Sequence, residues 1–455
     1  MGNLSFSAAI LLLIFLVFHS CSQQAGGQSP PLPPPGCPCA PPLPPPPPGR
    51  PSPTPPKTPP VCRCPPKRRP RLAPAPIPPE LLRDIRTIQR FKKRITYDPL
   101  NITKTWRGRN ICTDPTVYKG FICGKINKTD RNRVAGVKFN GFNFNGNPLN
   151  VTDFIEDLKD LVFFHANSNN ISGPTPARVA LLPYFFELDF SNNKLTGSFP
   201  NEILGATNLT FMDVRFNQLT GSVPPQVFRQ DLDVLFLNNN KFSGRLPASI
   251  GSTPALYLTL ANNRFTGPIP KTIKHAATTL IEVLFLNNQL SGCLPYEIGL
   301  LKKVTIFDAS INKLTGRIPY SLGCMARMQQ LNLANNQLYG EIPEIVCRLK
   351  NLYKLTLKNN YFTVVGPQCR KLITKKVLDV SMNCIAGLPS QRSKQECDAF
   401  KKQRNPCLAE QRRYHHVPCQ IANSTSQEMS ESEDAPAPTP SIAPSPSYAA
   451  LIKHG

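Results

Sequence analysis

The sequence is poor in tryptophan and in acidic residues, and it has no long apolar segment. One tryptophan occurs among 455 residues, and 28 acidic residues stand against 53 lysines and arginines. The longest apolar run, Ala8 to Phe18, is well short of the ~20 residues that a membrane-spanning helix needs. Its place near the start of the chain, before small and polar residues, is typical of a secretory signal peptide.

Motifs for catalysis and metal binding are also missing. The chain has no nucleophile elbow, no H-E-x-x-H sequence and no phosphate-binding loop. The close cysteine pairs, Cys37 with Cys39 and Cys62 with Cys64, lack the C-x2-C spacing of structural zinc sites. In a secreted chain such cysteines are expected to form disulfides, so we expect no metal site. Because the catalytic motifs are missing, we also expect no enzymatic activity and no cofactor.

One asparagine recurs in the same context along the middle of the chain. It stands at positions 169, 193, 217, 240, 263, 288, 312, 336, 360 and 383. Each unit follows L-x-L-x-x-N-x-L-x-G-x-I-P, as in Leu188 to Pro200. This period falls in the range of leucine-rich repeats. The sequence therefore predicts an α/β-type leucine-rich-repeat solenoid of the plant-specific kind, with about 10–11 repeats, disulfide-bearing caps and disordered proline-rich ends.

The alternation within each unit predicts the role of its residues. Apolar residues two apart point inward from a short strand, and the residues beside them face the concave surface. The recurring asparagine is expected to be buried, with its amide satisfying backbone groups of neighbouring turns. Asn288 stands 25 positions after Asn263, whereas the other spacings are 23 or 24, so we expect a bulge near Asn288.

The composition changes along the chain give the expected organisation. Most of the 51 prolines lie outside the repeats, in segments that cannot bury a core. We expect a signal peptide at 1–24, a proline-rich disordered region at 25–79, an N-terminal cap at 80–133, repeats at 134–389, a cysteine-rich C-terminal cap at 390–420 and a disordered Ser/Pro/Ala-rich tail at 421–455. In the N-terminal cap, Leu82, Ile85, Ile88 and Phe91 are expected on one helical face.

Cysteines and sequons agree with secretion. Of 15 cysteines, Cys21 lies near the expected cleavage site, which leaves 14. The cysteines expected in disulfides of the caps and repeats are Cys112, Cys123, Cys293, Cys324, Cys347, Cys369, Cys384, Cys397, Cys407 and Cys419. Spacing alone does not fix connectivity. The expected pairs are Cys112 with Cys123, Cys347 with Cys369, and Cys293 with Cys324. Expected glycosylation sites are Asn101, Asn127, Asn150, Asn170, Asn208 and Asn423.

The net charge of +25 predicts anionic partners outside the cell rather than nucleic acid. Acidic wall polysaccharide is the expected partner of the basic flanks. These flanks are Lys67 to Arg71, Arg83 to Arg94, Arg370 to Lys376 and Arg392 to Arg413. A solvated face without a ligand is the alternative interpretation of such charge runs.

Acidic residues recur at one outward slot of the strands. The candidate ligand-binding residues of the concave face are Glu187, Asp189, Asp213, Arg215, Glu282, Asp308 and Asp379. Aligned like charges would attract a cationic peptide. The alternatives are that strand faces simply carry charge and that the repeats inherited one slot.

Several segments resemble the plant leucine-rich-repeat extensin family. They are Tyr97 to Thr103 with Trp106, Gly120 to Cys123, Phe185 to Asn193, Asp213 to Asn217, and Leu388 to Ser393 before Cys397. The resemblance covers about residues 80 to 410. It implies a secreted wall protein that binds small, basic, cysteine-rich peptide hormones of the rapid alkalinisation factor type in wall-integrity or growth signalling. Two alternatives share the fold: an inhibitor of secreted pectin-degrading enzymes, and a structural polysaccharide-binding wall protein.

The chain departs from the family pattern in its proline-rich parts. Extensin repeats normally follow the leucine-rich repeats, whereas here the proline-rich block precedes them and contains no tyrosine between Pro30 and Pro79. The chain therefore resembles a relative that lacks the C-terminal extensin domain. Covalent cross-linking into the wall through tyrosine is not expected.

Overall fold

The structure is a computed structural model that describes residues 77–126, 131–402, 407, 415–419 and 451. All of them lie within the unit Pro76–Gly455. Several expectations lie outside the described residues: the signal peptide, nearly all of the proline-rich region, most of the tail, the basic cluster at 67–71, the cysteines at 21, 37, 39, 62 and 64, and the sequons at Asn127 and Asn423. In the described part, no helix is long and apolar enough to cross a membrane.

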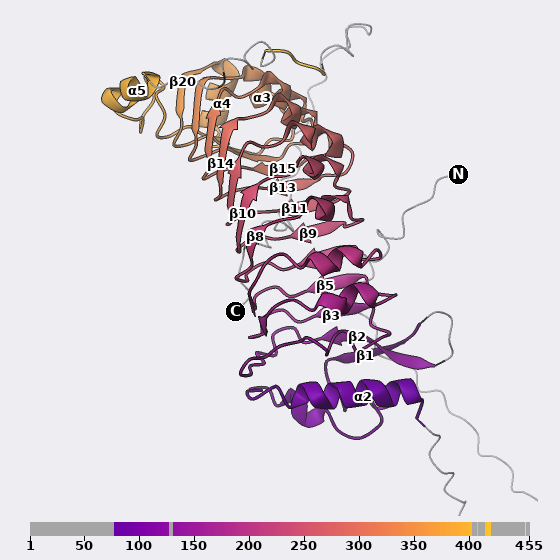
Figure 1. Cartoon of the computed structure of the whole chain (residues 1–455). Helices are drawn as coiled ribbons and strands as arrows, with labels where there is room; N and C mark the ends of the chain where they lie inside the picture. Colours follow the sequence, from indigo (N-terminus) through magenta and orange to yellow (C-terminus); the bar gives the residue numbers. More distant parts are fainter. Residues whose placement is uncertain (1–76, 127–130, 403–406, 408–414, 420–450, 452–455) are drawn as a thin grey trace, which may run out of the picture. The chain divides into compact units, whose positions relative to one another are not determined.

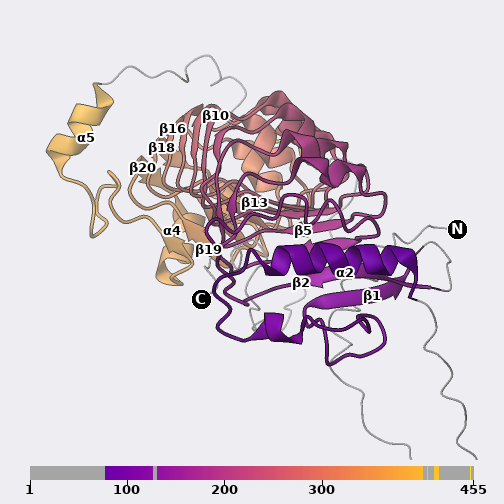
Figure 2. The ribbon, with the colours of Figure 1, turned by 60° about the horizontal axis from the view of Figure 1, so that its bottom comes forward.

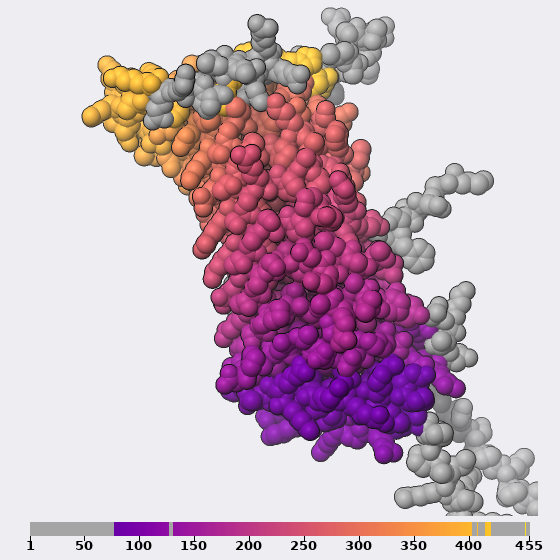
Figure 3. Space-filling model, in the orientation of Figure 1, coloured from indigo at the N-terminus to yellow at the C-terminus, as the bar shows by residue number. Residues whose placement is uncertain are grey.

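Helix α2 (Pro79–Lys92) closes the N-terminal end of the repeats, next to β1 (Phe121–Lys125) and β2 (Asn132–Lys138) (Figures 1 and 2). In the space-filling view, the indigo N-terminal residues form one end of the stacked repeats (Figure 3). Pro79 at its first position suits a helix start, because proline has no N–H to leave unpaired. The buried face consists of Leu81, Asp84, Thr87, Ile88 and Phe91. The expected face is therefore wrong by one position at Leu82 and Ile85, which are only half-buried.

Aromatic side chains form the core under this helix. Phe91 stacks on Phe154 with ring centroids 3.9 Å apart, and Phe139 lies against both rings. Trp106 follows the 3₁₀ helix η1 (Ile102–Thr105) and is 1% exposed, while its indole N–H donates to the Lys119 carbonyl at 2.9 Å. The tryptophan is thus buried with its one donor satisfied.

The repeats stack their strands into a twelve-stranded sheet. β1 pairs antiparallel with β2, and every later pairing is parallel, so eleven strands of the described chain follow the repeat. After β1 and β2 come β3 (Phe163–His165), β5 (Glu187–Asp189), β7 (Phe211–Asp213), β9 (Val234–Phe236), β11 (Tyr257–Thr259), β13 (Glu282–Leu284), β15 (Ile306–Asp308), β17 (Gln330–Asn332), β19 (Lys354–Thr356) and β21 (Leu378–Asp379). The predicted solenoid and its repeat number are confirmed.

After the turn, most repeats add a second short strand, and these strands form two smaller sheets. The pair is β4 (Ser172–Gly173) with β6 (Lys194–Leu195). The seven-stranded sheet contains β8 (Thr220–Ser222), β10 (Lys241–Arg245), β12 (Arg264–Gly267), β14 (Gln289–Cys293), β16 (Lys313–Gly316), β18 (Gln337–Ile342) and β20 (Tyr361–Val365). The motif glycine takes a positive φ here, for example 86° at Gly244, which explains its recurrence.

Short helices complete most repeats. They are η2 (Ala177–Leu181), η3 (Asn201–Gly205), η4 (Pro225–Arg229), η5 (Ala248–Ser252), η6 (Lys271–Ala276), η7 (Tyr296–Leu300), η8 (Tyr320–Cys324), α3 (Glu344–Cys347) and α4 (Pro367–Thr374), and helix α5 (Lys394–Lys401) follows the last strand. The motif proline directly precedes most of the 3₁₀ helices, as Pro247 precedes η5 and Pro295 precedes η7. Its fixed φ sets the direction in which the chain enters the turn.

The recurring asparagines form the expected buried column. The side-chain amide of Asn240 donates to the Val214 carbonyl at 2.9 Å and to the Leu237 carbonyl at 3.2 Å. Its carbonyl oxygen accepts the Leu219 N–H at 3.0 Å. Each asparagine therefore joins its own turn to the preceding repeat, and the role predicted from the sequence is confirmed.

The expected bulge near Asn288 is wrong. β13 pairs in regular register with both neighbours, and Asn288 makes the same bonds as the other column asparagines. The extra residue lies instead between Pro270 and β13, where η6 has six residues and the other 3₁₀ helices from η2 to η8 have five. A helix on the outside absorbs an insertion without breaking the ladder that stacks the repeats.

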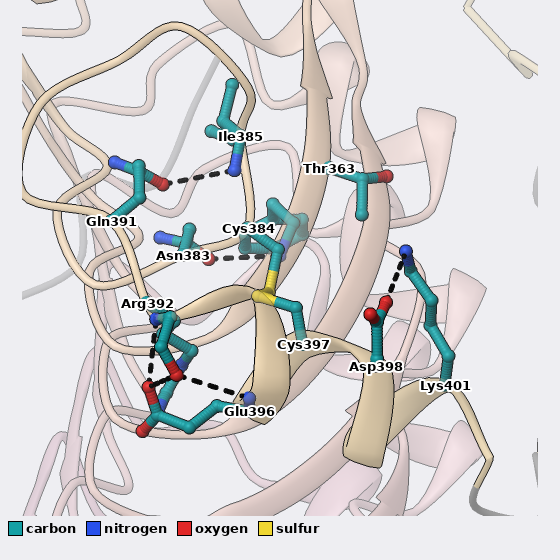
Figure 4. The surroundings of a disulfide bond; sticks show 12 residues. Thr363, Asn383, Cys384, Ile385, Gln391, Arg392, Glu396, Cys397, Asp398 and Lys401 are labelled. Carbon is teal, nitrogen blue, oxygen red and sulfur yellow. Dashed lines mark hydrogen bonds and ion pairs between the residues drawn. A yellow bond between two sulfur atoms is a disulfide. The ribbon is translucent and has the colours of Figure 1, made fainter.

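The end of the solenoid is closed around a disulfide between Cys384 and Cys397 (Figure 4). Gln391 accepts from the Ile385 N–H at 3.1 Å and donates to the Val380 carbonyl, which satisfies backbone groups of the last repeat. Ser393 caps α5 reciprocally with Glu396. The segment Leu388 to Ser393 thus has a structural role in the cap.

The disulfides agree with two expected pairs and correct the third. Cys112 pairs with Cys123, and Cys347 with Cys369. The expected Cys293–Cys324 bond is wrong: Cys293 bonds Cys407, and Cys324 bonds Cys419. Cys293 ends a strand of the seven-stranded sheet whereas Cys324 ends η8, so each meets the returning chain instead of the other.

We call the described residues of this returning chain, Cys407 and 415–419, the strap. Its histidines lie against tyrosines of consecutive repeats, with His416 and Tyr296 ring centroids 6.0 Å apart and those of His415 and Tyr320 4.9 Å apart. The strap therefore fastens chain from beyond α5 to repeats in the body of the solenoid.

Candidate functional site

The candidate acidic residues lie in the twelve-stranded sheet as predicted, but most are buried. Asp189 is 9% exposed, Asp213 2% and Asp308 1%, while Asp379 at the sheet edge is exposed. The expectation that this column is an open, solvated surface is therefore wrong for three of its four aspartates. Neighbouring strands in the parallel ladder bring side chains of one slot together, and these shield each other from water.

The aspartates hold the chain as it turns out of the strand. Asp189 accepts the Ser191 N–H at 2.8 Å and the Asn167 amide at 2.9 Å. Asp379 accepts the N–H of Ser381, two residues on, in the same way. Aspartate recurs in this slot because its short carboxylate can accept a backbone N–H two residues later.

Asp308 has the most complete set of bonds. Its carboxylate accepts the Ser310 N–H at 2.8 Å, the Ser310 hydroxyl at 2.6 Å and the Asn332 amide at 2.8 Å. Three donors compensate for much of the cost of burying the charge. This arrangement gives Asp308 a structural role that is independent of any ligand.

Asp213 differs because its burial is poorly compensated. Desolvation, followed by repulsion from Asp189, raises the pKa of Asp213 to about 8, against the opposing effect of Arg215. The folded-state pKa therefore lies above the unfolded value of about 3.9, so the carboxyl stabilises the fold at low pH and this contribution is lost as the pH rises towards 8. In acidic surroundings Asp213 is neutral and contributes little attraction for a cation.

Glu187 and Glu282 occupy the slot before the inward residue of their strands. Glu187 is half-buried, and a carboxylate oxygen lies 2.8 Å from His165 Nε2. Glu282 is 5% exposed. Glu187 is therefore the more accessible of the two carboxylates.

Arg215 lies beside this group. Its Nε is 3.2 Å from a carboxylate oxygen of Asp213, and its guanidinium lies over the Phe236 ring at 5.6 Å from the centroid. The side chain is thus held against the sheet instead of extending into solvent. Arginine stacked on an aromatic ring is common at binding surfaces.

Aromatic residues of the same surface were missed in the sequence analysis. Phe163, Phe211 and Tyr257 occupy the slot of Glu187 on β3, β7 and β11 and are half-buried. We call these three the aromatic row. Their position could have been predicted from the sequence, because each directly precedes an inward-pointing residue of its strand. Only the charged residues of this surface were considered as candidates.

The basic flanks differ in their accessibility. On α2, Arg90 forms a 2.7 Å ion pair with Asp157, and Arg94 donates to the carbonyls of Asn150 and Thr152. On α4 the basic side chains of Arg370, Lys371, Lys375 and Lys376 lie at or just after the helix and are exposed. The first flank is thus partly used within the cap, whereas the second faces solvent.

The outer face of the small sheets carries further cations. Exposed lysines and arginines recur in the slot after the column asparagine and at the end of β10, at Lys194, Lys241, Arg245, Arg264 and Lys313. In the small sheet, the strands β8, β10, β12, β14 and β16 contain no acidic residue. This face is a row of positive charges that the sequence analysis did not identify.

Other expected sites are distributed over the surface. Asn101 and Asn208 are exposed, and Asn150 and Asn170 are half-buried. Among the described residues, no group of three or more His, Cys, Asp or Glu side chains is placed to hold a metal ion.

Comparison with known proteins places the repeats in context. Residues 186–206, 231–253 and 327–349 match the family described as Leucine Rich Repeat. The chain is 43% identical to leucine-rich repeat extensin-like protein 7 of Arabidopsis thaliana over 335 residues, which cover 72% of this chain and 75% of that protein. It is 45% identical to extensin-like protein 1 of the same plant over 71% of this chain.

The coverage is less complete for the longer relatives. The chain spans 40% of extensin-like protein 2 and 43% of extensin-like protein 1. Among solved structures, it is similar to the leucine-rich-repeat ectodomain of the Arabidopsis thaliana receptor kinase GASSHO1/SCHENGEN3, in complex with CASPARIAN STRIP INTEGRITY FACTOR 2, with a TM-score of 0.55 and 24% identity over 67% of this chain and 38% of that chain. At this identity the likeness shows the fold alone.

Proposed function

The chain belongs to the leucine-rich repeat extensin-like family, and from that premise we propose that it is an extracellular wall protein whose concave sheet binds a peptide. The observation that carries the proposal is the aromatic row, Phe163, Phe211 and Tyr257, half-buried beside Glu187 and His165. Rigid aromatic side chains next to a few charged groups are typical of the residues that dominate binding energy at protein interfaces.

The proposed ligand is a small basic cysteine-rich peptide hormone of the rapid alkalinisation factor type, as the family resemblance implies. Glu187 is the accessible carboxylate beside the aromatic row, and Asp379 is exposed at the far edge of the sheet. Asp213 adds little charge below its raised pKa of about 8. Aromatic contacts supply the main affinity, and the carboxylates favour a cationic partner.

Replacing Phe211 and Tyr257 with alanine tests this surface. We expect each change to weaken binding of such a peptide by about 2 kcal/mol, or roughly 30-fold, because anchors of this kind lose that much when truncated. Titration calorimetry on the secreted full chain measures it, after circular dichroism has shown that the variants are folded.

Tyr97→Ala is the matched control, because Tyr97 is 57% exposed and lies in the N-terminal cap rather than in the strands of the repeats. Equal loss in the control, or full affinity in the folded Phe211→Ala/Tyr257→Ala variant, would exclude the aromatic row. Capture of a pectin-degrading enzyme from wall extracts, with no peptide bound, would support the inhibitor class instead.

Retention on acidic wall polysaccharide is a second proposed function, favoured by the cations outside the concave sheet. Lys241, Arg264 and Lys313 stand on β10, β12 and β16 of one parallel sheet. Arg264 lies opposite Ser243 rather than Lys241, so the cations form a slanted row across the sheet. The exposed basic residues of α4 add to them. A linear polymer of carboxylates is the partner that suits such a row.

We expect molar salt to release the protein from isolated walls. Raising the salt from 0.1 M to 1 M shortens the range of exposed charge interactions from about 10 Å to about 3 Å. Extraction at stepped salt concentrations, followed by immunoblotting, measures the release. Protein that remains until the polysaccharide is digested would indicate covalent or entangled attachment and contradict electrostatic retention.

A further inference from the structure

The middle of the concave sheet is apolar where other strands are polar. Leu284 on β13 occupies the slot of Asp189, Asp213 and Asp308. Leu284 forms a small buried cluster with Ala261 and Ile306, separate from the main core, and Leu286 packs against it. A cluster on this side of the sheet cannot be explained by stacking of the repeats, because the core of the repeats lies on the other side.

A residue from far along the chain covers this cluster. Leu451 packs against the cluster of Ala261, Leu284 and Ile306. We call these three residues and Leu286 the apolar patch. Leu451 follows the strap residue Cys419, bonded to Cys324, by 32 residues. A chain of that length can reach about 100 Å, so the contact within one molecule needs no strain.

In the slot before the inward residue of each strand from β9 to β17, burial is also highest on β13 and β15. Val234 and Tyr257 are half-buried in the slot before the inward residue, and so is Gln330 further on. Between them, Glu282 is 5% and Ile306 3% exposed. These residues share one slot in successive strands, so the difference lies in what covers them rather than in their place in the repeat.

We infer that Leu451 docks in cis onto the apolar patch, at the middle of the concave sheet. Burial of a leucine side chain provides the attachment. Tethering raises the effective concentration of the segment to about the millimolar range, so a weak contact suffices.

The docked segment lies next to the surface proposed for the peptide. Tyr257 of the aromatic row pairs with Glu282 in the sheet, so a ligand that extends past β11 must displace the segment. This consequence rests on the proposed function, whereas the docking itself does not. Leu451 is therefore an internal competitor for this part of the concave sheet.

Hydroxyl-radical footprinting of the full chain tests the docking without any peptide hormone. In Leu451→Asp, which places a charge on the apolar patch, oxidation of Leu284, Leu286 and Ile306 is expected to rise at least threefold. Val234, outside the patch, should not change, and Ser441→Asp serves as the charge-matched control in the same tail. Unchanged oxidation of the patch in Leu451→Asp would overturn the inference.

A second measurement separates a contact within one molecule from a contact between molecules. A photo-reactive side chain at position 451 should cross-link to β11, β13 or β15 within the monomer, and cross-linked dimers in its place would overturn docking in cis. A synthetic peptide of residues 445–455 should restore protection to Leu451→Asp when added in trans, but the same peptide with aspartate at 451 should not.

Competition with a peptide ligand is tested by measuring peptide affinity, separately from the footprint. A basic cysteine-rich peptide should bind Leu451→Asp at least threefold more tightly than the unaltered chain. Equal affinity together with a raised footprint would overturn competition and leave docking in place. A peptide that binds neither chain, with a raised footprint, would contradict the proposed function and not the docking.

Discussion

Replacing Cys293 and Cys407 with alanine is expected to lower the free energy of unfolding by about 4 to 5 kcal/mol. The bond joins residues 114 positions apart, and the chain-entropy model gives a cross-link of that span roughly this stabilisation. The loss should be concentrated from β14 onward. Repeats contact mainly their neighbours, so the effect fades along the solenoid instead of spreading evenly.

Hydrogen exchange with mass spectrometry measures this difference along the chain. β5 to β11 should keep their protection, because the segment from 169 to 263 contains no cysteine. Cys112→Ala/Cys123→Ala is the control: its span of 11 residues predicts about 3 kcal/mol, lost in the N-terminal cap. Uniform loss of protection over all repeats in the Cys293→Ala/Cys407→Ala variant would contradict a local fastening role.

The repeat could be predicted from the sequence because one residue type serves one purpose in every unit. The amide of Asn240 satisfies backbone groups of its own and of the preceding turn, and no other side chain of that size offers two N–H donors beside a carbonyl acceptor. A requirement that recurs at each turn leaves a period in the sequence. Strand positions and the buried column therefore followed from pattern alone.

Contacts between distant parts of the chain leave no such period. The partners of Cys293 and Cys324 lie 114 and 95 residues away, on chain that returns from beyond α5. Sequence proximity favoured joining them to each other, and that was wrong. The contact of Leu451 with the cluster around Leu284 could not be predicted for the same reason, since nothing near Leu451 in the sequence indicates this cluster.

The sequence predicted which residues lie on the concave surface, but not which of them are exposed. Alternation places Asp213 and Asp308 on this side of the sheet, yet their burial depends on neighbours in adjacent strands, which alternation does not describe. A search for charged residues finds the carboxylates of this surface but does not find Phe211 and Tyr257. The accessible chemistry of this surface is therefore more aromatic and less acidic than its sequence suggested.

Replacing Asp308 with alanine is expected to lower the free energy of unfolding by about 2 to 5 kcal/mol. The change leaves the Ser310 N–H and the Asn332 amide without their acceptor in a site that is 1% exposed. Each buried donor left unsatisfied costs about 1 to 3 kcal/mol. Urea denaturation followed by circular dichroism measures the loss.

Asp379→Ala is the matched control, since Asp379 accepts the same two donors from Ser381, but at an exposed position. Water can replace the lost acceptor there, so we expect less than about 1 kcal/mol. Equal losses in the two variants would mean that burial does not set the cost. Peptide affinity of the folded fraction then separates the two roles of the slot: a purely structural Asp308 leaves it unchanged, whereas a ligand-binding Asp308 weakens it. The first outcome is the one its three internal hydrogen bonds favour, because a carboxylate already saturated by the fold has little left to offer a ligand.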